Sequence, residues 1–281
     1  MPDSGSTPVY RGNLDKLVEK VLEERGLDLS QYRRTYLERR LAARLRVLDV
    51  HTYRQYAERL DRDPHEYEHL IDAVTINVTE FFRDAGVWEM LRRRVLPDLI
   101  AEKKRVRSRT IRVWSAGCAT GEEPYSAAMA LLDALGPDAE HFLVSVIGSD
   151  LDPEALAVAG RGIFEADKLK RISPNYQVRF LRPGSESTFE IGPEVKRICR
   201  FMHFSLFDQP PMRMLDLVLC RNVFIYFDRE RQTRVVKNFW HAMGSDAYLV
   251  LGRSERLTAD AARLFVPVDG RERIYRKSVD E

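Results

Sequence analysis

The sequence predicts an α/β protein built on a Rossmann-like sheet, with a small antiparallel β insertion and an all-helical domain in front of it. From Thr110 onward, short apolar runs alternate with helical segments, which is typical of a parallel sheet with helices on both faces. A strand, a glycine-bearing turn and a helix follow one another over residues 111–135. Before residue 75, apolar residues recur at helical spacing.

The first 75 residues divide into a start without predicted structure and a helical domain. Residues 1–13 are rich in proline, serine and threonine, and we expect them to be disordered. Residues 14–25 form an amphipathic helical pattern that Gly26 stops. We therefore assign residues 14–75 to a helical domain, with further helices at 32–48, 53–60 and 66–74. The helix at 32–48 places Leu37, Leu41, Leu45 and Leu48 on one buried stripe.

Residues 76–109 are expected to form a linker and a connecting helix. The helical pattern begins at residue 85. We expect it to end near Pro97, because proline lacks the N–H that continues a helix.

Residues 110–281 form the predicted α/β domain. Its strands are expected at 111–114, 142–147, 215–219 and 248–251, and its helices at 126–135, 153–159 and 229–242. Residues 265–268 and 273–277 flank Asp269-Gly270, which predicts a terminal hairpin.

A segment at about residues 176–204 does not fit the alternation. It contains the strand-like runs 177–181, 188–191 and 198–204, broken by Pro183-Gly184 and Gly192-Pro193. We expect these three runs to form the small antiparallel insertion.

The turn Ser115-Ala-Gly-Cys-Ala-Thr-Gly-Glu-Glu-Pro-Tyr125 indicates the ligand class. It contains neither the G-x-G-x-x-G dinucleotide fingerprint nor a P-loop. Glu122 and Glu123 stand at the start of the next helix, where they repel phosphate and favour a cationic ligand such as S-adenosylmethionine. Asp150 follows the next strand, and an acid at that position can accept the ribose hydroxyls of an adenosine.

Composition limits the other classes of function. No apolar run approaches the ~20 residues that span a bilayer, and no secretory leader is visible, so we expect a cytoplasmic protein. The three cysteines have no metal-ligand spacing, and we expect no metal site. Residues 31–46 hold six arginines and one acid, which favours an acidic partner, whether nucleic acid, membrane or protein.

Three segments, in order, resemble the CheR-type chemotaxis receptor methyltransferases. They are Asn77-Val-Thr-Glu-Phe-Phe-Arg83, Thr120-Gly-Glu-Glu-Pro-Tyr-Ser126 and Cys220-Arg-Asn-Val-Phe-Ile-Tyr-Phe-Asp228. The resemblance runs from about Leu14 to the C-terminus. It implies a protein-glutamate O-methyltransferase that uses S-adenosylmethionine, releases S-adenosylhomocysteine and methylates chemoreceptors during sensory adaptation.

The resemblance also implies the site residues. Arg83 and Tyr226 are the expected catalytic residues, with Arg83 aiming a substrate carboxylate and Tyr226 hydrogen-bonding it. Ser205-Leu206 stands where the family has an Asn-Leu pair beside the adenine. The expected cofactor contacts are Asn77, Thr79, Arg83, Glu123, Asp150, Ser205, Leu206, Arg221 and Asn222.

Recognition of the receptor is expected on the arginine-rich helix. Arg33, Arg40 and Arg44 share a stripe beside the apolar face, and we expect them to bind the acidic flank of a receptor methylation helix. Family members that bind a C-terminal receptor pentapeptide carry G-x-G in the insertion, whereas Pro183-Gly-Ser-Glu-Ser187 has one glycine. We therefore expect that no receptor pentapeptide is bound. We also expect a monomer that neither binds nucleic acid nor inserts into a membrane.

Two alternatives stay open from the residues alone. One is a methyltransferase of another protein or of RNA, although Arg221-Asn-Val-Phe224 replaces the N-P-P-[YF] motif of many nucleic-acid enzymes. The other is a receptor-binding adaptor without activity. Cofactor binding distinguishes an enzyme from such an adaptor.

Overall fold

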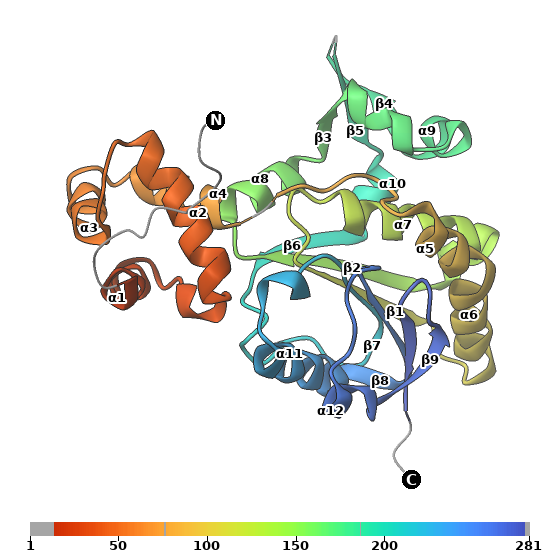
Figure 1. The fold of residues 1–281 in the computed structure, drawn as a ribbon. Coiled ribbons are helices and arrows are strands. Elements are labelled where there is room, and N and C mark those ends of the chain that lie inside the picture. Colours follow the sequence, from red (N-terminus) through yellow and green to blue (C-terminus); the bar gives the residue numbers. More distant parts are fainter. Residues whose placement is uncertain (1–13, 76, 186, 279–281) are drawn as a thin grey trace, which may run out of the picture. The chain divides into compact units, whose positions relative to one another are not determined.

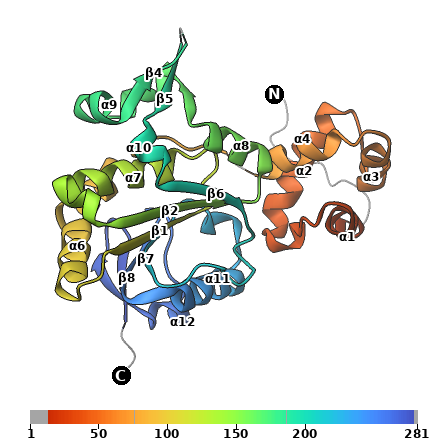
Figure 2. The same ribbon diagram turned by 180° about the vertical axis from the view of Figure 1, so that it is seen from behind.

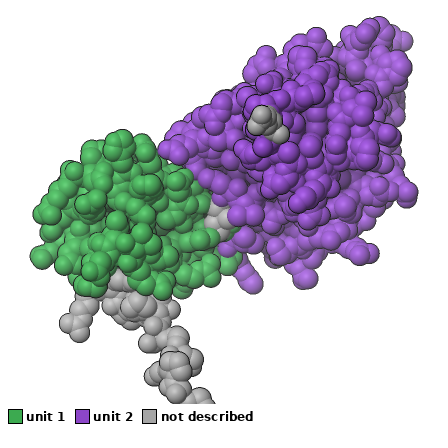
Figure 3. Space-filling model, turned by 90° about the horizontal axis from the view of Figure 1, so that it is seen from above, with its two compact units in different colours: residues 1–76, 226–228 green, residues 77–225, 229–281 purple. Residues whose placement is uncertain are grey.

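A computed structural model describes residues 14–75, 77–185 and 187–278. The chain divides into two compact units, one of residues 1–76 and 226–228 and one of residues 77–225 and 229–281 (Figure 3). The expected disorder of residues 1–13 falls outside the described residues.

The first unit is helical, as predicted. Its elements are α1 (Leu14–Arg25), a 3-10 turn (Leu29–Gln31), α2 (Arg34–Val47), α3 (Tyr53–Arg62) and α4 (Glu66–Val74). Gly26 ends α1 with a φ of 67°, a left-handed conformation that glycine adopts without strain. The core of the unit consists of buried residues at helical spacing: Leu14, Leu17, Val21, Leu37, Leu41, Leu45, Tyr56, Leu60, Leu70 and Val74.

Residues 226–228 pack with this helical unit although they follow a strand of the other unit. The main-chain N–H of Arg33 donates to the carbonyl of Tyr226 at 2.9 Å. The Tyr226 and Tyr36 ring centroids are 4.9 Å apart, and those of Phe227 and Tyr32 are 6.2 Å apart.

The helix expected to end near Pro97 continues past it, so that prediction was wrong. Helix α5 (Ala85–Met90) passes into a π-helical turn (Leu91–Val95) and then into α6 (Leu96–Arg105). The N–H of Leu96 bonds to the carbonyl of Leu91, five residues back. Pro97 then stands in the first turn of α6, where its missing N–H costs little.

The second unit contains a seven-stranded sheet in the order β6-β2-β1-β7-β8-β10-β9 (Figures 1 and 2). The strands are β1 (Thr110–Ala116), β2 (Leu143–Asp150), β6 (Cys199–His203), β7 (Leu215–Cys220), β8 (Met243–Leu251), β9 (Phe265–Asp269) and β10 (Ile274–Lys277). The first five strands in this order run parallel, and β10 is antiparallel to both β8 and β9. The predicted Rossmann-like sheet and terminal hairpin are confirmed.

Helices cover both faces of this sheet, as expected for a parallel sheet. Helices α7 (Glu122–Leu135) and α8 (Pro153–Arg161) lie on one face and α11 (Arg229–Ala242) lies on the other (Figures 1 and 2). Side chains alternate along β1, so Ile111 and Val113 join the core cluster of α7. Trp114 points the other way, and its ring meets Phe239 of α11 at 5.1 Å.

The antiparallel insertion exists, but its strands differ from the predicted ones. The small sheet has the order β3-β5-β4, formed by β3 (Ile163–Glu165), β5 (Thr188–Ile191) and β4 (Leu181–Pro183). Residues Pro174–Phe180 form helix α9, which begins with Ser173 as its cap. Strand β6 pairs with β2 of the main sheet. The predicted strands 177–181 and 198–204 of the insertion were therefore wrong, and only 188–191 was right.

The remaining elements are short. They are the 3-10 turns Gly136–His141, Ala166–Arg171 (η4 in the text below) and Phe224–Tyr226, and the helices α10 (Pro193–Lys196) and α12 (Ala259–Ala262). No helix in the described ranges is both long and apolar enough to cross a bilayer.

Candidate active site

The site lies where the strand order of the main sheet reverses. Strand β1 pairs with β2 on one side and with β7 on the other. Ligands of open α/β sheets bind outside the carboxyl ends of the strands at such a point. The residues described next lie in the segments that follow β1, β2, β6, β7 and β8 and in residues 77–84 before α5.

The turn after β1 needs glycine at two positions. Gly117 has a φ of 79°, and a Cβ there would stand 2.6 Å from the side chain of Val223. Gly121 has a φ of 97°, and a Cβ there would stand 2.8 Å from Ala159 on α8. The two glycines let the turn lie close to its neighbours. The N–H groups of Gly117 and Cys118 donate to the Ser149 carbonyl at 2.8 and 2.9 Å, which holds the turn against the end of β2.

Asp150, at the end of β2, organises this turn. Its Oδ2 accepts from the N–H of Ala119 at 2.8 Å, and its Oδ1 accepts from the N–H of Asp152 at 3.1 Å. Burial raises the pKa of the Asp150 carboxyl, and these backbone donors oppose the rise. The two oxygens of a carboxylate offer about four acceptor positions, so capacity remains for a ligand hydroxyl.

Asn77 is tied to the same strand end. Its Nδ2 donates to Oδ2 of Asp152 at 2.6 Å. Oδ1 of Asp152 accepts from the first N–H groups of α8 at 2.9 and 3.0 Å. The buried Asp152, which sequence reasoning missed, therefore caps α8 and fixes Asn77. Thr79, two residues after Asn77, is half-buried.

Arg83 lies in a strained loop. Its neighbours Phe82 and Asp84 have φ values of 50° and 59°, and such conformations of non-glycine residues cluster at functional sites. The Arg83 carbonyl accepts from Nε1 of Trp88 at 2.9 Å. Its guanidinium donates to the Val78 carbonyl at 3.0 Å, and within the described ranges its other donors stay open to an anion.

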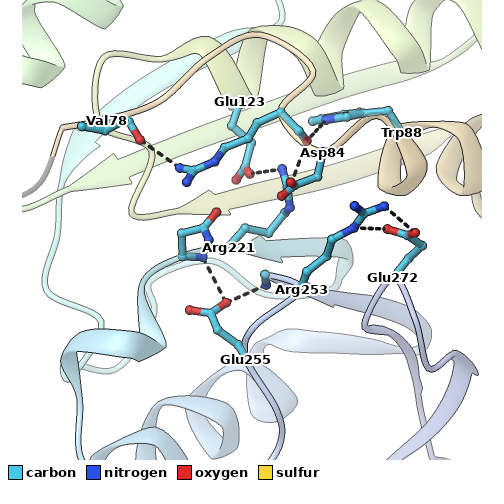
Figure 4. A network of polar contacts seen from close by, with 11 residues as sticks. Val78, Asp84, Trp88, Glu123, Arg221, Arg253, Glu255 and Glu272 are labelled. Atoms are coloured by element: carbon cyan, nitrogen blue, oxygen red, sulfur yellow. Dashed lines mark hydrogen bonds and ion pairs between the residues drawn. The ribbon is translucent and has the colours of Figure 1, made fainter.

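Arg221, at the end of β7, connects the segments through one guanidinium (Figure 4). Its Nη1 pairs with Glu123 at 3.1 Å, and its Nη2 pairs with Asp84 at 2.7 Å. The same Nη2 donates to the Arg83 carbonyl at 2.8 Å. The side chain is 2% exposed, and its buried Nε has no hydrogen-bond partner among the described residues.

The two acids at the start of α7 have different partners. Glu123 accepts from Ser115 Oγ at 2.8 Å with one oxygen and pairs with Arg221 through the other. Glu122 is fully buried and pairs with Lys168, and its second oxygen accepts from Thr120 Oγ1 at 2.7 Å. Glu123 therefore faces Arg221 and the other site residues, whereas Glu122 is buried against Lys168 and Thr120.

Glu255 is a buried carboxylate that sequence reasoning missed. It accepts from the N–H groups of Gly252 at 2.6 Å, Asn222 at 3.0 Å and Phe224 at 2.7 Å. These bonds connect the ends of β7 and β8 (Figure 4) and hold Asn222 at a φ of 63°. Burial raises the pKa of Glu255, and the backbone donors oppose the rise.

Two further predicted residues follow β6. Ser205 is half-buried, and its Oγ accepts from the N–H of Phe207 at 3.3 Å. Leu206 is buried, and its carbonyl accepts from Asn238 at 3.3 Å. In this way α11 fixes the backbone of the segment after the edge strand.

The three predicted recognition arginines lie in the helical unit. Nε of Arg33 donates to the Phe227 carbonyl at 2.7 Å, and the Arg40 guanidinium lies 5.5 Å from the centre of the Tyr36 ring. Arg44 forms a two-point ion pair with the buried Glu66, with Nε 2.6 Å from Oε1. The pairing makes Arg44 a structural residue of this unit, whatever its role in recognition.

These features are typical of a nucleoside-binding α/β domain. The sheet is Rossmann-like, an acid follows its second strand, and arginines and acids pair beside a glycine-containing turn. Residues 77–274 match the family described as "CheR methyltransferase, SAM binding domain", and residues 12–75 match "CheR methyltransferase, all-alpha domain". The chain therefore belongs to the CheR methyltransferase family, whose members are S-adenosylmethionine-dependent methyltransferases.

Relatives along nearly the whole chain agree with this assignment. The chemotaxis protein methyltransferase of Borreliella burgdorferi is 28% identical over 253 residues, covering 89% of both chains. Chemotaxis protein methyltransferase 2 of Pseudomonas aeruginosa is 30% identical over 268 residues, covering 91% of this chain and 93% of that one. The enzyme of Salmonella typhimurium is 32% identical over 250 residues, covering 86% and 83%.

The residues at the site fit S-adenosylmethionine. Asp150 offers carboxylate lone pairs suited to ribose hydroxyls, and Glu123 offers a negative charge suited to an ammonium group. The Arg83 guanidinium and the unpartnered Nε of Arg221 offer donors suited to a carboxylate.

Proposed function

We propose that this protein transfers methyl groups from S-adenosylmethionine to glutamate side chains of chemoreceptors in the cytoplasm, and so adjusts receptor output during sensory adaptation. The products are glutamate methyl esters and S-adenosylhomocysteine. The observation that supports this most strongly is the ordered match of both family domains, which covers residues 12–75 and 77–274.

The chemistry needs orientation more than acid–base catalysis. When bound, S-adenosylmethionine supplies an electrophilic methyl group on a sulfonium sulfur. A solvated glutamate, with a pKa of about 4.3, is already ionised at neutral pH and needs no base. The contribution of the chain is therefore to hold the carboxylate in line in a partly desolvated site.

Arg83 and Tyr226 are the residues proposed for this orientation. Trp88 and Arg221 donate hydrogen bonds to the Arg83 carbonyl. The backbone that carries the Arg83 guanidinium is therefore fixed. A guanidinium can bind a carboxylate at two points and aim one oxygen. In this proposal the phenol of Tyr226 donates a hydrogen bond to the same carboxylate.

Receptor recognition is proposed for the arginine-rich helix α2. Arg33 and Arg40 remain candidates for contacts with acidic receptor side chains. Arg39 is exposed on the same helix and adds positive charge. Arg44 is less suited to a direct test, because its loss would leave Glu66 buried and unpaired.

Methyl transfer with an Arg83→Ala variant tests the proposal. We expect transfer of tritiated methyl groups to a receptor cytoplasmic domain to fall about 100-fold, the cost of a misplaced reacting group. Stability to denaturant should stay close to wild type, because among the described residues the Arg83 guanidinium bonds only to the exposed Val78 segment. Arg161→Ala, at an exposed arginine of α8, is the matched control.

Two outcomes would contradict different parts of the proposal. Near wild-type transfer by Arg83→Ala would remove the orienting role. The wild-type protein could also bind S-adenosylmethionine in calorimetry and yet methylate no receptor domain. That result would contradict the proposed substrate but not the cofactor.

A further inference from the structure

The turn η4 (Ala166–Arg171) connects the small sheet to the cofactor site. It follows β3 of the small sheet and forms two ion pairs outside the insertion. Lys168 pairs with Glu122 at the start of α7. Arg171 pairs with Glu80 at 2.8 Å, in the segment that carries Thr79 and Arg83.

The two ion pairs differ in strength. The Arg171 and Glu80 side chains are 60% and 40% exposed, and such pairs contribute little because water screens them. The Glu122 carboxylate is fully buried, so removal of its cation leaves a charge without compensation. Lys168 is therefore the more important of the two.

Glu122 is connected through neighbouring hydrogen bonds both to Arg221 and to the backbone before Arg83. The next residue, Glu123, holds Ser115 and Arg221. The carbonyl of Glu122 accepts from Ser126 Oγ at 2.6 Å, and the same Oγ accepts from the N–H of Phe82 at 3.0 Å. The position of Glu122 therefore affects the first turn of α7 and the backbone just before Arg83.

Aromatic packing holds the insertion against the same segment. The Phe81 ring meets Phe164 of β3 edge-on at 5.0 Å. The Phe82 ring lies 5.5 Å from that of Tyr176 on α9. These contacts keep η4 beside the cofactor segments, where the Lys168 ammonium can reach Glu122.

We propose that Lys168 is a positioning residue of the cofactor site, through which the β insertion sets the affinity for S-adenosylmethionine. By holding Glu122, Lys168 fixes the start of α7 and the loop before Arg83 in the arrangement that binds the cofactor. A change in the insertion that moves η4 then changes cofactor affinity, and cofactor binding stabilises the insertion by the same free energy.

Calorimetry of S-adenosylmethionine binding, without receptor, tests this proposal independently of the proposed substrate. We expect Lys168→Met to raise Kd about tenfold, in the range of residues that couple two parts of a protein. Lys168→Arg keeps the charge and should restore most of the affinity. Lys170→Met is the matched control, since Lys170 is exposed on the same turn and should leave Kd unchanged.

A double variant separates positioning from charge neutralisation. Lys168→Met combined with Glu122→Gln removes the buried unpaired charge, so the melting temperature should return toward wild type. The proposal predicts that Kd stays raised, because the connection between η4 and α7 is still missing. Recovery of both melting temperature and Kd, or an unchanged Kd in Lys168→Met alone, would overturn it.

Discussion

The guanidinium of Arg221 shows how one side chain organises a site. It pairs with Glu123 and Asp84 and also bonds the Arg83 carbonyl. A lysine could not replace it, because an ammonium lacks the planar set of donors that reaches several acceptors in fixed directions. The two acids also offset the desolvation cost of a cation that is only 2% exposed.

Arg44 is predicted to stabilise the helical unit. Arg44→Met would leave Glu66, which is 1% exposed, without its cation, although Tyr56 would still donate to it. We expect a loss of about 3–5 kcal/mol in the free energy of unfolding, measured with denaturant.

Arg54→Met is the control for this experiment. Arg54 is 85% exposed, and its replacement should change the stability by about 0.5 kcal/mol at most. Equal effects of the two substitutions would show that the ion pair of Arg44 is dispensable.

Asp150 is predicted to bind the cofactor. Asp150→Asn keeps the size of the side chain but removes its charge, and one of its two acceptor oxygens becomes a donor. We expect weaker S-adenosylmethionine binding by about 1.5–3 kcal/mol for one lost charge-assisted bond, measured by calorimetry.

Asp260→Asn, at an exposed position on α12, provides the comparison. Asp150 would lose the proposed ribose role if a folded Asp150→Asn variant bound the cofactor as tightly as this control.

The resemblance to a family named the candidate site residues, but no sequence pattern indicated how they pair. Arg83, Glu123, Asp150 and Arg221 all follow or border predicted elements, so their neighbourhood was predictable. The pair Arg221–Glu123 spans 98 residues of chain, and no local pattern indicates it. Glu255 has no motif around it, and only its backbone donors identify it.

At the scale of elements, the ends of β7 and β8 depend on Glu255. Glu255→Ala would leave the N–H groups of Gly252, Asn222 and Phe224 without this acceptor. Because an unsatisfied buried group costs about 1–3 kcal/mol, we expect a loss of about 3 kcal/mol or more in the free energy of unfolding. Cofactor affinity should fall as well, because Asn222 lies in the same loop.

Arg256→Ala, one residue further on and exposed, should change neither quantity. A Glu255→Ala protein with wild-type stability would mean that water replaces the carboxylate at these donors.

Local hydrophobic patterns predicted where helices and strands form. They did not predict which strands pair with each other. The leucine stripe of α2 follows helical spacing, and β1, β2 and β7 are short apolar runs, of which β7 is buried along its whole length. The strand that became β6 was placed in the wrong sheet, because its apolar pattern does not say which neighbour it pairs with. Ser173-Pro174 is a start signal for helix α9, and it outweighs the strand-like pattern of residues 177–181.

At the scale of the whole molecule, charge is nearly balanced and locally uneven. The chain carries 45 basic and 43 acidic side chains, for a net charge of +2, yet residues 31–46 hold six arginines and one acid. Overall charge therefore favours no particular partner, whereas helix α2 presents a local positive field.

Receptor methylation is predicted to be salt-dependent. Added salt screens exposed charges beyond about 8–10 Å, so the KM for receptor should rise with ionic strength while the Kd for S-adenosylmethionine changes little. Steady-state methylation at several salt concentrations measures this. A KM that is independent of salt, together with tight binding of a free receptor C-terminal pentapeptide, would transfer recognition from α2 to the insertion.

The membership of residues 226–228 in the helical unit has a consequence for biosynthesis. The contacts of Tyr226 and Phe227 with Tyr36 and Tyr32 cannot form until the ribosome has added the intervening α/β chain. At about 5–20 residues per second, that addition takes roughly 8–30 s. Throughout that interval the stacked rings of Tyr32 and Tyr36, 5.8 Å apart, lack their contacts with Phe227 and Tyr226, so the nascent helical domain exposes aromatic surface that the finished chain covers.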